Sequence, residues 1–149
     1  MILVSGDLTP SQKEDYKNYW LDFYDNRITF LGEATYSYNC HNYAWVKSKG
    51  GITAWINTPG DDAFWDDCSY LEVPTVNYAS AVSFGNADDH SAIPSPQQGY
   101  YNSKWGPGPL FKHTINDCPY NPSDLHYFGP TMSGSTIVCT SNETFSLDY

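Results

Sequence analysis

The stretch that decides how this chain is interpreted is Tyr38-Asn39-Cys40-His41-Asn42-Tyr43-Ala44-Trp45. Asn39 is a residue type that caps helix N-termini, so a helix is expected to start at Cys40, run to about residue 48 and stop at Gly50-Gly51. A thiol in the first helical turn lies near the positive end of the helix dipole and near backbone N–H groups without intrahelical acceptors. Both features favour the thiolate, which is the nucleophilic form of cysteine. Cys40 is therefore the candidate nucleophile.

A second helix is expected nearer the N-terminus. Thr9 is a suitable N-cap, Pro10 suits the first helical position and Gln12 completes a capping box. Aromatic residues follow with helical spacing, and the helix should end near Asn26. We interpret this stripe as core packing rather than as a ligand platform; its members are Tyr16, Tyr19, Trp20, Phe23 and Tyr24.

After residue 79 the hydrophobic period changes to two, which is typical of strands. Strands are expected at residues 79–84, 90–93, 99–105 and 110–113, in addition to an earlier one at 28–31. Residues 52–56 fit either a strand or a short helical turn, and residues 58–67 read as a loop. The order of helices followed by an antiparallel meander predicts an α+β domain.

Composition restricts the possible partners. The chain has 149 residues and a net charge of −10, and its seven basic residues are scattered, which disfavours nucleic acid as a partner. No apolar run is long enough to insert into a membrane. The low charged fraction and the many small polar residues indicate a secreted or cell-surface protein, whose signal peptide we expect to be absent from this chain.

A thiol nucleophile needs a base that takes its proton and a group that orients the base. His90 opens a predicted strand and is the candidate base, with a hydrogen-bonded structural histidine as the alternative. The orienting group is expected among Asn102 and Ser103 on the next strand, or at His113, for which a structural role is the stronger expectation. Buried structural thiols are common, which leaves that alternative open for Cys40.

Neither a metal nor a cofactor is expected. His41 and His126 are expected at the surface, and no histidine or cysteine spacing fits a zinc site. The acidic pairs at residues 61–62, 66–67 and 88–89 lack the pattern of a calcium-binding EF-hand and read as solvated loops or helix caps.

Three segments occur in a suggestive order: NCHNYAW (39–45), HSAI (90–93) and SKWGPGPLFKH (103–113). A helix-borne Cys, a strand-opening His and a polar residue on the following strand resemble the papain-like cysteine peptidases. The segment AVSFGNADDHSAI (81–93) is similar to the NlpC-type and CHAP-type peptidoglycan peptidases and amidases. The three segments also resemble a group of uncharacterised bacterial papain-like domains. The resemblance covers residues 36–120.

The resemblance implies a papain-like fold in which N-terminal helices pack on a small antiparallel β-sheet. It implies Cys40 as nucleophile and His90 as general base and acid, whereas the third position is not settled among Asn102, Ser103 and His113. His41 directly after the nucleophile departs from the cell-wall enzymes. The resemblance also implies residues that shape the site or bind substrate: Asn39, His41, Trp45, Lys104, Trp105 and Gly106.

The C-terminal segment is expected to differ from the rest. Residues 1–130 are assigned to the papain-like domain, and residues 131–149 to a linker and the beginning of a truncated module. The segment SGSTIVCTSNETFSL (133–147), with strands expected at 136–140 and 144–147, resembles the opening of Ig-like β-sandwich modules of secreted Bacteroidetes proteins. Further domains of a longer chain are then expected. Cys68 and Cys118 could form a disulfide, which would leave Cys139 without a partner here; four reduced cysteines are the alternative.

Two classes of function follow from these observations. The first is a secreted cysteine hydrolase that cleaves an amide bond, with a peptidoglycan stem peptide or another peptide as the substrate suggested by the resemblance. Acyl transfer by the same Cys and His is a variant of this class. The second is a non-catalytic glycan- or peptide-binding or adhesion module, in which Trp45, Trp55, Trp65 and Trp105 form the binding surface.

Overall fold

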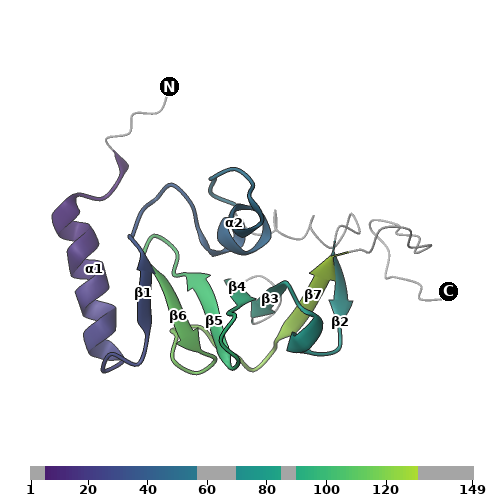
Figure 1. The fold of residues 1–149 in the computed structure, drawn as a ribbon. Helices are drawn as coiled ribbons and strands as arrows, with labels where there is room; N and C mark the ends of the chain where they lie inside the picture. Colours follow the sequence, from purple (N-terminus) through teal and green to yellow (C-terminus); the bar gives the residue numbers. More distant parts are fainter. Residues whose placement is uncertain (1–5, 57–69, 85–89, 131–149) are drawn as a thin grey trace.

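The fold is a single antiparallel sheet with one α-helix beside it and another above it (Figure 1). The structure is a computed structural model, and it describes residues 6–56, 70–84 and 90–130. The helices of this part are α1 (Pro10–Phe23), α2 (Cys40–Trp45) and two 3₁₀ turns, η2 (Lys47–Lys49) and η4 (Val76–Tyr78). Its strands are β1 (Thr29–Gly32), β2 (Tyr70–Val73), β3 (Ala81–Phe84), β4 (His90–Pro94), β5 (Tyr100–Lys104), β6 (Leu110–Thr114) and β7 (His126–Pro130).

The expected papain-like arrangement of helices packed on a small sheet is wrong. The described residues form a seven-stranded sheet in the order β1-β6-β5-β4-β3-β7-β2, with only two α-helices, one of them six residues long. The sequence reading identified β1 and β3 to β6 to within about two residues at each end. It missed β2 and β7, which pair with each other and extend the sheet beyond β3.

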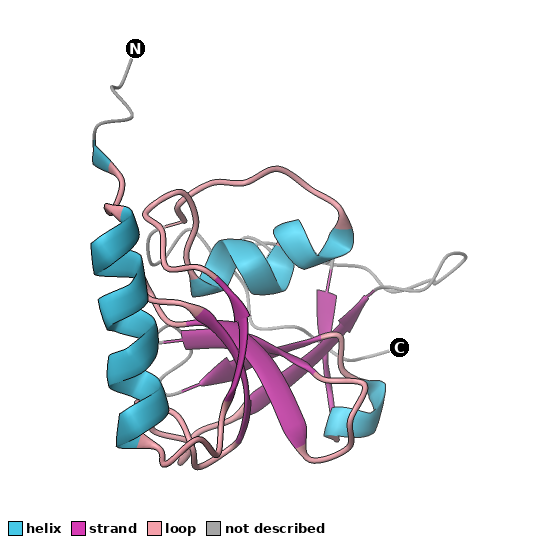
Figure 2. Cartoon of the chain, turned by 60° about the vertical axis from the view of Figure 1, so that its left-hand side comes forward, coloured by secondary structure: helices cyan, strands magenta, loops and turns pink. Residues whose placement is uncertain are grey.

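The central strands pair as a meander with one interruption. β3, β4, β5 and β6 follow each other in the sheet, and all their pairings are antiparallel. β4 divides its pairing, because His90 to Ala92 face β3 whereas Ile93 and Pro94 face β5. β4 therefore lies at a fork in the sheet, where its pairing changes from β3 to β5. Figure 2 shows the twisted strands with the helices beside them.

Each face of the sheet carries its own apolar cluster, because side chains of successive strand residues point to opposite faces. Ala81 and Phe128 pack with Ala44 and Trp45 of α2 on one face. Val82 and Phe84 pack on the other face with a larger cluster that also contains Tyr24, Ile28, Ala92, Tyr101, Trp105, Phe111 and Cys118. β3 is consequently buried along its whole length.

The start of α1 follows the expected capping pattern. The Thr9 hydroxyl accepts a hydrogen bond from the Gln12 backbone N–H, and the Gln12 side chain accepts one from the Thr9 backbone N–H, at 3.1 and 2.9 Å. These two bonds complete a capping box. The helix ends three residues before the expected position, because Asp25 and Asn26 adopt left-handed backbone angles.

The aromatic stripe of α1 is not core packing along its length. No residue of α1 is buried, and Tyr19 and Phe23 are 59% and 61% exposed. Only Tyr24, just after the helix, is buried, while Trp20 packs edge-to-face on Trp105 with ring centroids 5.2 Å apart. The stripe thus anchors α1 to the sheet through Trp20 and Tyr24, whereas Tyr19 and Phe23 face solvent.

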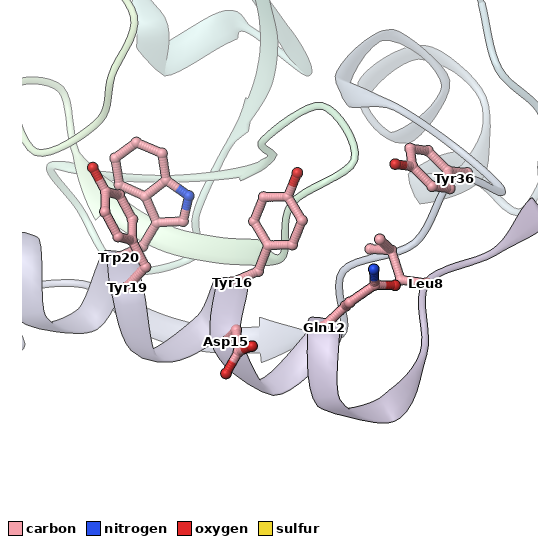
Figure 3. A pocket seen from close by; sticks show the side chains of 7 residues that line it. All are labelled: Leu8, Gln12, Asp15, Tyr16, Tyr19, Trp20 and Tyr36. Carbon is pink, nitrogen blue, oxygen red and sulfur yellow. The ribbon is translucent and has the colours of Figure 1, made fainter.

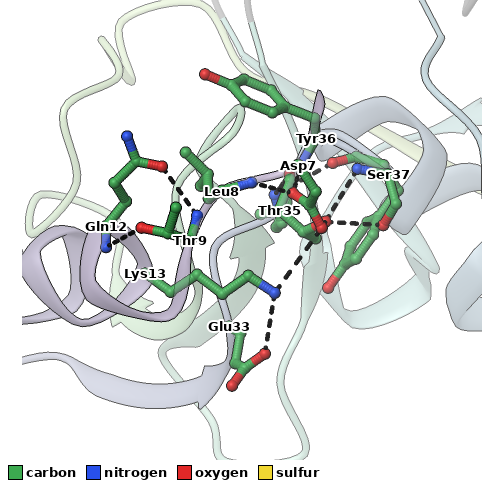
Figure 4. Close-up of polar contacts among 11 residues, drawn as sticks. Asp7, Leu8, Thr9, Gln12, Lys13, Glu33, Thr35, Tyr36 and Ser37 are labelled. Atoms are coloured by element: carbon green, nitrogen blue, oxygen red, sulfur yellow. Dashed lines mark hydrogen bonds and ion pairs between the residues drawn. The ribbon is translucent and has the colours of Figure 1, made fainter. Parts of the chain in front are cut away.

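A carboxylate clamp ties the beginning of α1 to the segment that leads into α2 (Figure 4). Asp7 accepts hydrogen bonds from the Tyr36 backbone N–H at 3.0 Å and from the Thr35 hydroxyl at 2.9 Å. A further bond from the Leu8 backbone N–H, at 2.8 Å, completes the clamp. These bonds, with the backbone donors as the largest contribution, lower the pKa of Asp7 below its usual value. The clamp holds residues 35–37 opposite the first turns of α1.

Other expectations have mixed outcomes. Residues 52–56 form neither strand nor helix. Cys118 is a buried free thiol, so the expected disulfide with Cys68 is not formed. The expected loop at 58–67, Trp65 and the Ig-like segment at 131–149 lie outside the described residues. Among the helices in the part of the chain that is described, none has the length and apolar character needed to cross a membrane.

Candidate functional site

Cys40 is the first residue of α2, as its capping pattern predicts. The Asn39 side-chain oxygen accepts hydrogen bonds from the backbone N–H groups of Asn42 at 3.1 Å and Ile56 at 3.3 Å. The Asn39 amide group donates to the Ile56 carbonyl at 2.7 Å, so this side chain also fixes the segment that follows the helix. α2 ends at Trp45, earlier than expected, and Gly50 with its left-handed φ of 88° ends the 3₁₀ turn that follows. Cys40 itself is buried.

The residue after Cys40 holds the helix to the sheet. His41 is 4% exposed rather than at the surface, because its Nδ1 forms a 2.7 Å hydrogen bond with the Ser91 hydroxyl of β4. The Trp45 indole N–H donates to the same Ser91 oxygen at 3.0 Å. Trp45 packs edge-to-face on Tyr70 and Phe128. Sequence reasoning missed Ser91, although the alternation of β4 places it on the face opposite His90.

A buried lysine fixes the segment that delivers Cys40. The side chain of Lys104, at the end of β5, is fully buried, and its Nζ donates to three backbone carbonyls: Thr35 at 2.9 Å, Tyr38 at 3.1 Å and Gly106 at 2.6 Å. Three acceptors match the three N–H donors of an ammonium group. Gly106 can present its carbonyl here because it adopts a φ of +60°, which glycine accommodates without strain.

Lys104 is also an electrostatic neighbour of Cys40. Burial lowers the pKa of Lys104 to about 7, and the negative charge of the Cys40 thiolate acts in the opposite direction. Because this interaction is mutual, an ammonium at Lys104 stabilises the thiolate form of Cys40. The three carbonyl acceptors favour the same protonated form of the lysine, since a neutral amine has one N–H fewer to donate.

His90 lies at the fork in the sheet. It pairs with Phe84 of β3, the centroids of the two rings are 5.1 Å apart, and its own ring is fully buried. The ring stacks on Tyr120 with centroids 3.6 Å apart and an interplanar angle of 3°. Among the described residues, neither ring nitrogen of His90 has a hydrogen-bond partner. Burial first, and then the nearby His113 and His41, lower the pKa of His90 well below its usual value, so the imidazole is neutral at pH 7.

Tyr120 joins the surroundings of Cys40 and His90. Burial raises the pKa of Tyr120 far above its usual value, and the charge of Cys40 is the largest of the neighbouring charges that add to this rise. The phenol is therefore close enough to Cys40 to respond to its ionisation while its ring covers His90. No pattern in the sequence pointed to Tyr120, which follows β6 and reaches the site through tertiary packing.

The three residues expected to orient His90 have other partners. The Ser103 hydroxyl and His113 Nε2 are 2.7 Å apart, and His113 Nδ1 donates to the Thr114 carbonyl at 2.7 Å. His113 Nε2 must then accept from Ser103, which fixes the neutral tautomer; burial lowers the pKa of His113 to about 4. Asn102 lies on the other face and hydrogen-bonds Tyr43 of α2. The stacked ring of Tyr120, rather than a hydrogen bond, orients His90 here.

Two of the four tryptophans expected to form a binding surface are buried. Trp45 and Trp105 are 2% and 4% exposed and belong to the two apolar clusters. The Trp105 indole N–H donates to Ser103 at 3.0 Å and so extends the His113 hydrogen-bond chain. Trp55 is exposed, whereas Trp65 is not among the described residues. Trp45 and Trp105 therefore pack in the core, and the expectation that they form part of a binding surface is wrong.

His126 of β7 is held by two acidic side chains. His126 is partly exposed and lies between two carboxylates, with Nδ1 2.8 Å from Glu72 and Nε2 2.9 Å from Asp124. In residues 6–56, 70–84 and 90–130, no three side chains of His, Cys, Asp or Glu gather in a way that could hold a metal ion.

Comparisons with protein-family models, with curated proteins and with solved structures find no match to this chain.

Proposed function

We propose that this protein is a cysteine hydrolase that cleaves an amide bond, with Cys40 as nucleophile and His90 as general base. The observation that carries the proposal is the fully buried imidazole of His90, whose two ring nitrogens have no hydrogen-bond partner in the described part of the chain. Its ring stacks on Tyr120, and the charge of Cys40 raises the pKa of that tyrosine. Unpartnered buried polar groups are rare because they cost free energy, and they concentrate at sites of function.

The proposed reaction uses these groups in two steps. In the first, His90 accepts the proton of the Cys40 thiol, the thiolate attacks the carbonyl carbon of the amide, and the imidazolium returns the proton to the departing amine. The product of this step is a thioester on Cys40. In the second, His90 takes a proton from water, the hydroxide attacks the thioester carbonyl, and the C–S bond breaks to release a carboxylic acid. The imidazolium returns its proton to the departing thiolate, which restores the thiol and the neutral imidazole. Backbone N–H groups of the first turn of α2 would hold the oxyanion.

Two surrounding groups support this assignment. The ammonium of Lys104 stabilises the thiolate, and its three hydrogen bonds fix the segment before Cys40. The stacked ring of Tyr120 fixes the plane of the His90 imidazole. The resemblance of residues 36–120 to peptidoglycan peptidases favours a peptide, and in particular a stem peptide of the cell wall, as substrate. Secretion or display at the cell surface is part of the same proposal.

The first experiment measures the alkylation rate of each cysteine against pH by mass spectrometry of its peptide. We expect Cys40 to react with an apparent pKa below that of a free thiol, about 8.5, and expect this pKa to rise in His90→Asn and in Lys104→Met. Cys118 serves as the internal control, because burial raises the pKa of its thiol to about 11. A Cys40 that reacts as slowly as Cys118, or that ignores both substitutions, would argue against the mechanism.

Activity then separates hydrolysis from the alternatives. Release of amines from cell-wall stem peptides should be lost in Cys40→Ala and in any other variant that lacks the thiol at position 40. Transfer of the acyl group to an added amine, in place of water, would instead assign acyl transfer to the same thioester. Saturable binding of the peptide with no turnover, together with an inert Cys40, would favour a binding module.

A further inference from the structure

A pocket lies on the exposed aromatic face of α1, outside the surroundings of Cys40 and His90 (Figure 3). We name it the aromatic pocket. Its volume is about 470 Å³, which is within the range of small-ligand sites. Four aromatic rings and two polar side chains line it, and the argument below uses these six: Gln12, Asp15, Tyr16, Tyr19, Trp20 and Tyr36.

The rings are distributed along the pocket rather than closed around one point. Trp20 and Tyr19 lie together at one end of the helical face, Tyr16 lies one turn earlier, and Tyr36 faces them from the segment before α2 (Figure 3). Tyr19 and Tyr36 are 59% and 50% exposed, so their surfaces are available to a ligand. A row of separated rings offers stacking surfaces to successive units of a chain-like ligand.

The polar groups of the aromatic pocket have unused hydrogen-bonding capacity. In the described part of the chain, the Asp15 carboxylate and the phenol groups of Tyr16 and Tyr36 form no hydrogen bond to protein. In the capping box the Gln12 side chain uses only its oxygen, so its amide N–H groups remain available to donate to a ligand. A carboxylate accepts hydrogen bonds only, whereas phenols and amide N–H groups donate. A suitable ligand must therefore present both donors and acceptors beside apolar faces.

We propose that the aromatic pocket binds a neutral oligosaccharide. A sugar ring offers an apolar C–H face to an aromatic ring and hydroxyl groups that donate to Asp15 and accept from phenols. A proline-rich peptide also fits aromatic grooves, but its proline residues have no N–H to give to a carboxylate. An anionic sugar would be repelled by Asp15 and by a chain of net charge −10.

The pocket is built before any ligand arrives. The Asp7 clamp fixes the backbone of Tyr36, and the capping box fixes Gln12 on the first turn of α1 (Figure 4). Tyr36 precedes Cys40 by four residues, so their Cα atoms lie within about 14 Å of each other. The proposal goes beyond the hydrolase proposal and does not depend on it, since no atom of Cys40 or His90 lines the pocket.

Isothermal titration calorimetry of the whole chain with defined tetrasaccharides tests this proposal. We expect chitotetraose or cellotetraose, both neutral, to bind the parent protein at millimolar concentration or below, and tetragalacturonate not to bind. Tyr19→Ala and Tyr36→Ala, both at exposed positions, should each weaken binding by about threefold to tenfold. Asp15→Asn, which removes the charge and keeps the shape, should weaken it by about tenfold.

Matched variants make the outcomes decisive. Tyr78→Ala and Asp22→Asn alter an exposed aromatic and an exposed carboxylate away from the pocket and should leave the affinity unchanged. Cys40→Ala should bind sugar like the parent, which separates this proposal from the hydrolase proposal. The proposal is overturned if no neutral tetrasaccharide binds, if the pocket variants bind like the parent, or if only a glucosamine tetramer or a proline-rich peptide binds.

Discussion

The two α-helices of this protein use their side chains in opposite ways. α2 has six residues, of which five are buried, including the polar His41 and Asn42. α1 has fourteen residues, none of them buried, and it exposes Tyr19 and Phe23. Partners outside the helix permit the burial of these polar groups, because His41 bonds Ser91 of β4 and the Asn42 amide donates to the Ile52 carbonyl.

The largest expected effect is the loss of Lys104. Lys104→Met leaves one buried and two partly buried carbonyls without this donor and should lower the free energy of unfolding by about 4 kcal/mol. Lys112→Met is the matched control, since Lys112 makes a single exposed hydrogen bond to Gln97. Urea unfolding measures both. If Lys104→Met were as stable as the control, the segment before α2 would not depend on the hydrogen bonds of this lysine.

Acidification is the next most damaging change, because buried neutral histidines lie in the sheet and none lies on α1. His113 has a pKa of about 4 in the fold against 6.5 in an unfolded chain. The unfolded chain therefore binds the extra proton as pH falls from about 6.5 to 4, and about 3 kcal/mol of stability should be lost over that window. His90 acts in the same direction.

Urea unfolding at a series of pH values gives the slope of stability in this window. His113→Gln should flatten the slope even if it lowers stability at every pH, so the slope rather than the absolute stability is the readout. An unchanged slope would contradict the assignment of a neutral buried histidine at this position.

Loss of the α2 cap should cost less. Asn39→Ala removes the side-chain bonds to Asn42 and Ile56 and should destabilise the fold by about 1–2 kcal/mol. It should also slow Cys40 alkylation, since the cap positions the first turn. Asn77→Ala, at an exposed asparagine, is the control and should change neither quantity. Reactivity that survives the loss of the cap would show that Cys40 is held by other contacts.

The smallest effect is expected on α1. Tyr19→Ala and Phe23→Ala remove exposed rings and should each change stability by no more than about 0.5 kcal/mol. Phe111→Ala, at a fully buried ring, should cost about 3–5 kcal/mol and sets the scale. Thermal or urea unfolding compares the three. A large loss at Tyr19 would mean that the stripe of α1 contributes to the core after all.

Local chemistry was readable from the sequence. The capping box of Thr9 and Gln12 and the Asn39 cap depend on residues three positions apart, so their side chains and acceptors are fixed by the helix itself. The alternating strands β3 to β6 are likewise defined by neighbouring residues. Cys40 was placed at the start of its helix for this reason.

What the sequence did not reveal depends on distant partners. β2 lies at the edge of the sheet and β7 lies between β2 and β3. These two strands form because Tyr70 pairs with Pro130 and Val73 with Tyr127, and their own sequence patterns are weak. His41 is buried because it shares a hydrogen bond with Ser91 of β4, and Tyr120, from the segment after β6, covers His90. Conversely, the stripe of α1 has the spacing of a core face but no layer of the sheet covers it fully. Periodicity indicates which face of a helix is apolar and leaves open what covers that face.

The sheet order has a consequence for the path by which the chain folds. β3 to β6 are joined by short connections, whereas β1 pairs Thr29 with Lys112 and β2 pairs Tyr70 with Pro130. Closing a long loop costs entropy before the pairing compensates for it, so such contacts form slowly. We expect the central meander to form early and both edges to dock late. The nascent thiol of Cys40, which lies in the chain between β1 and β2, would then reach its buried place only in the last steps of folding.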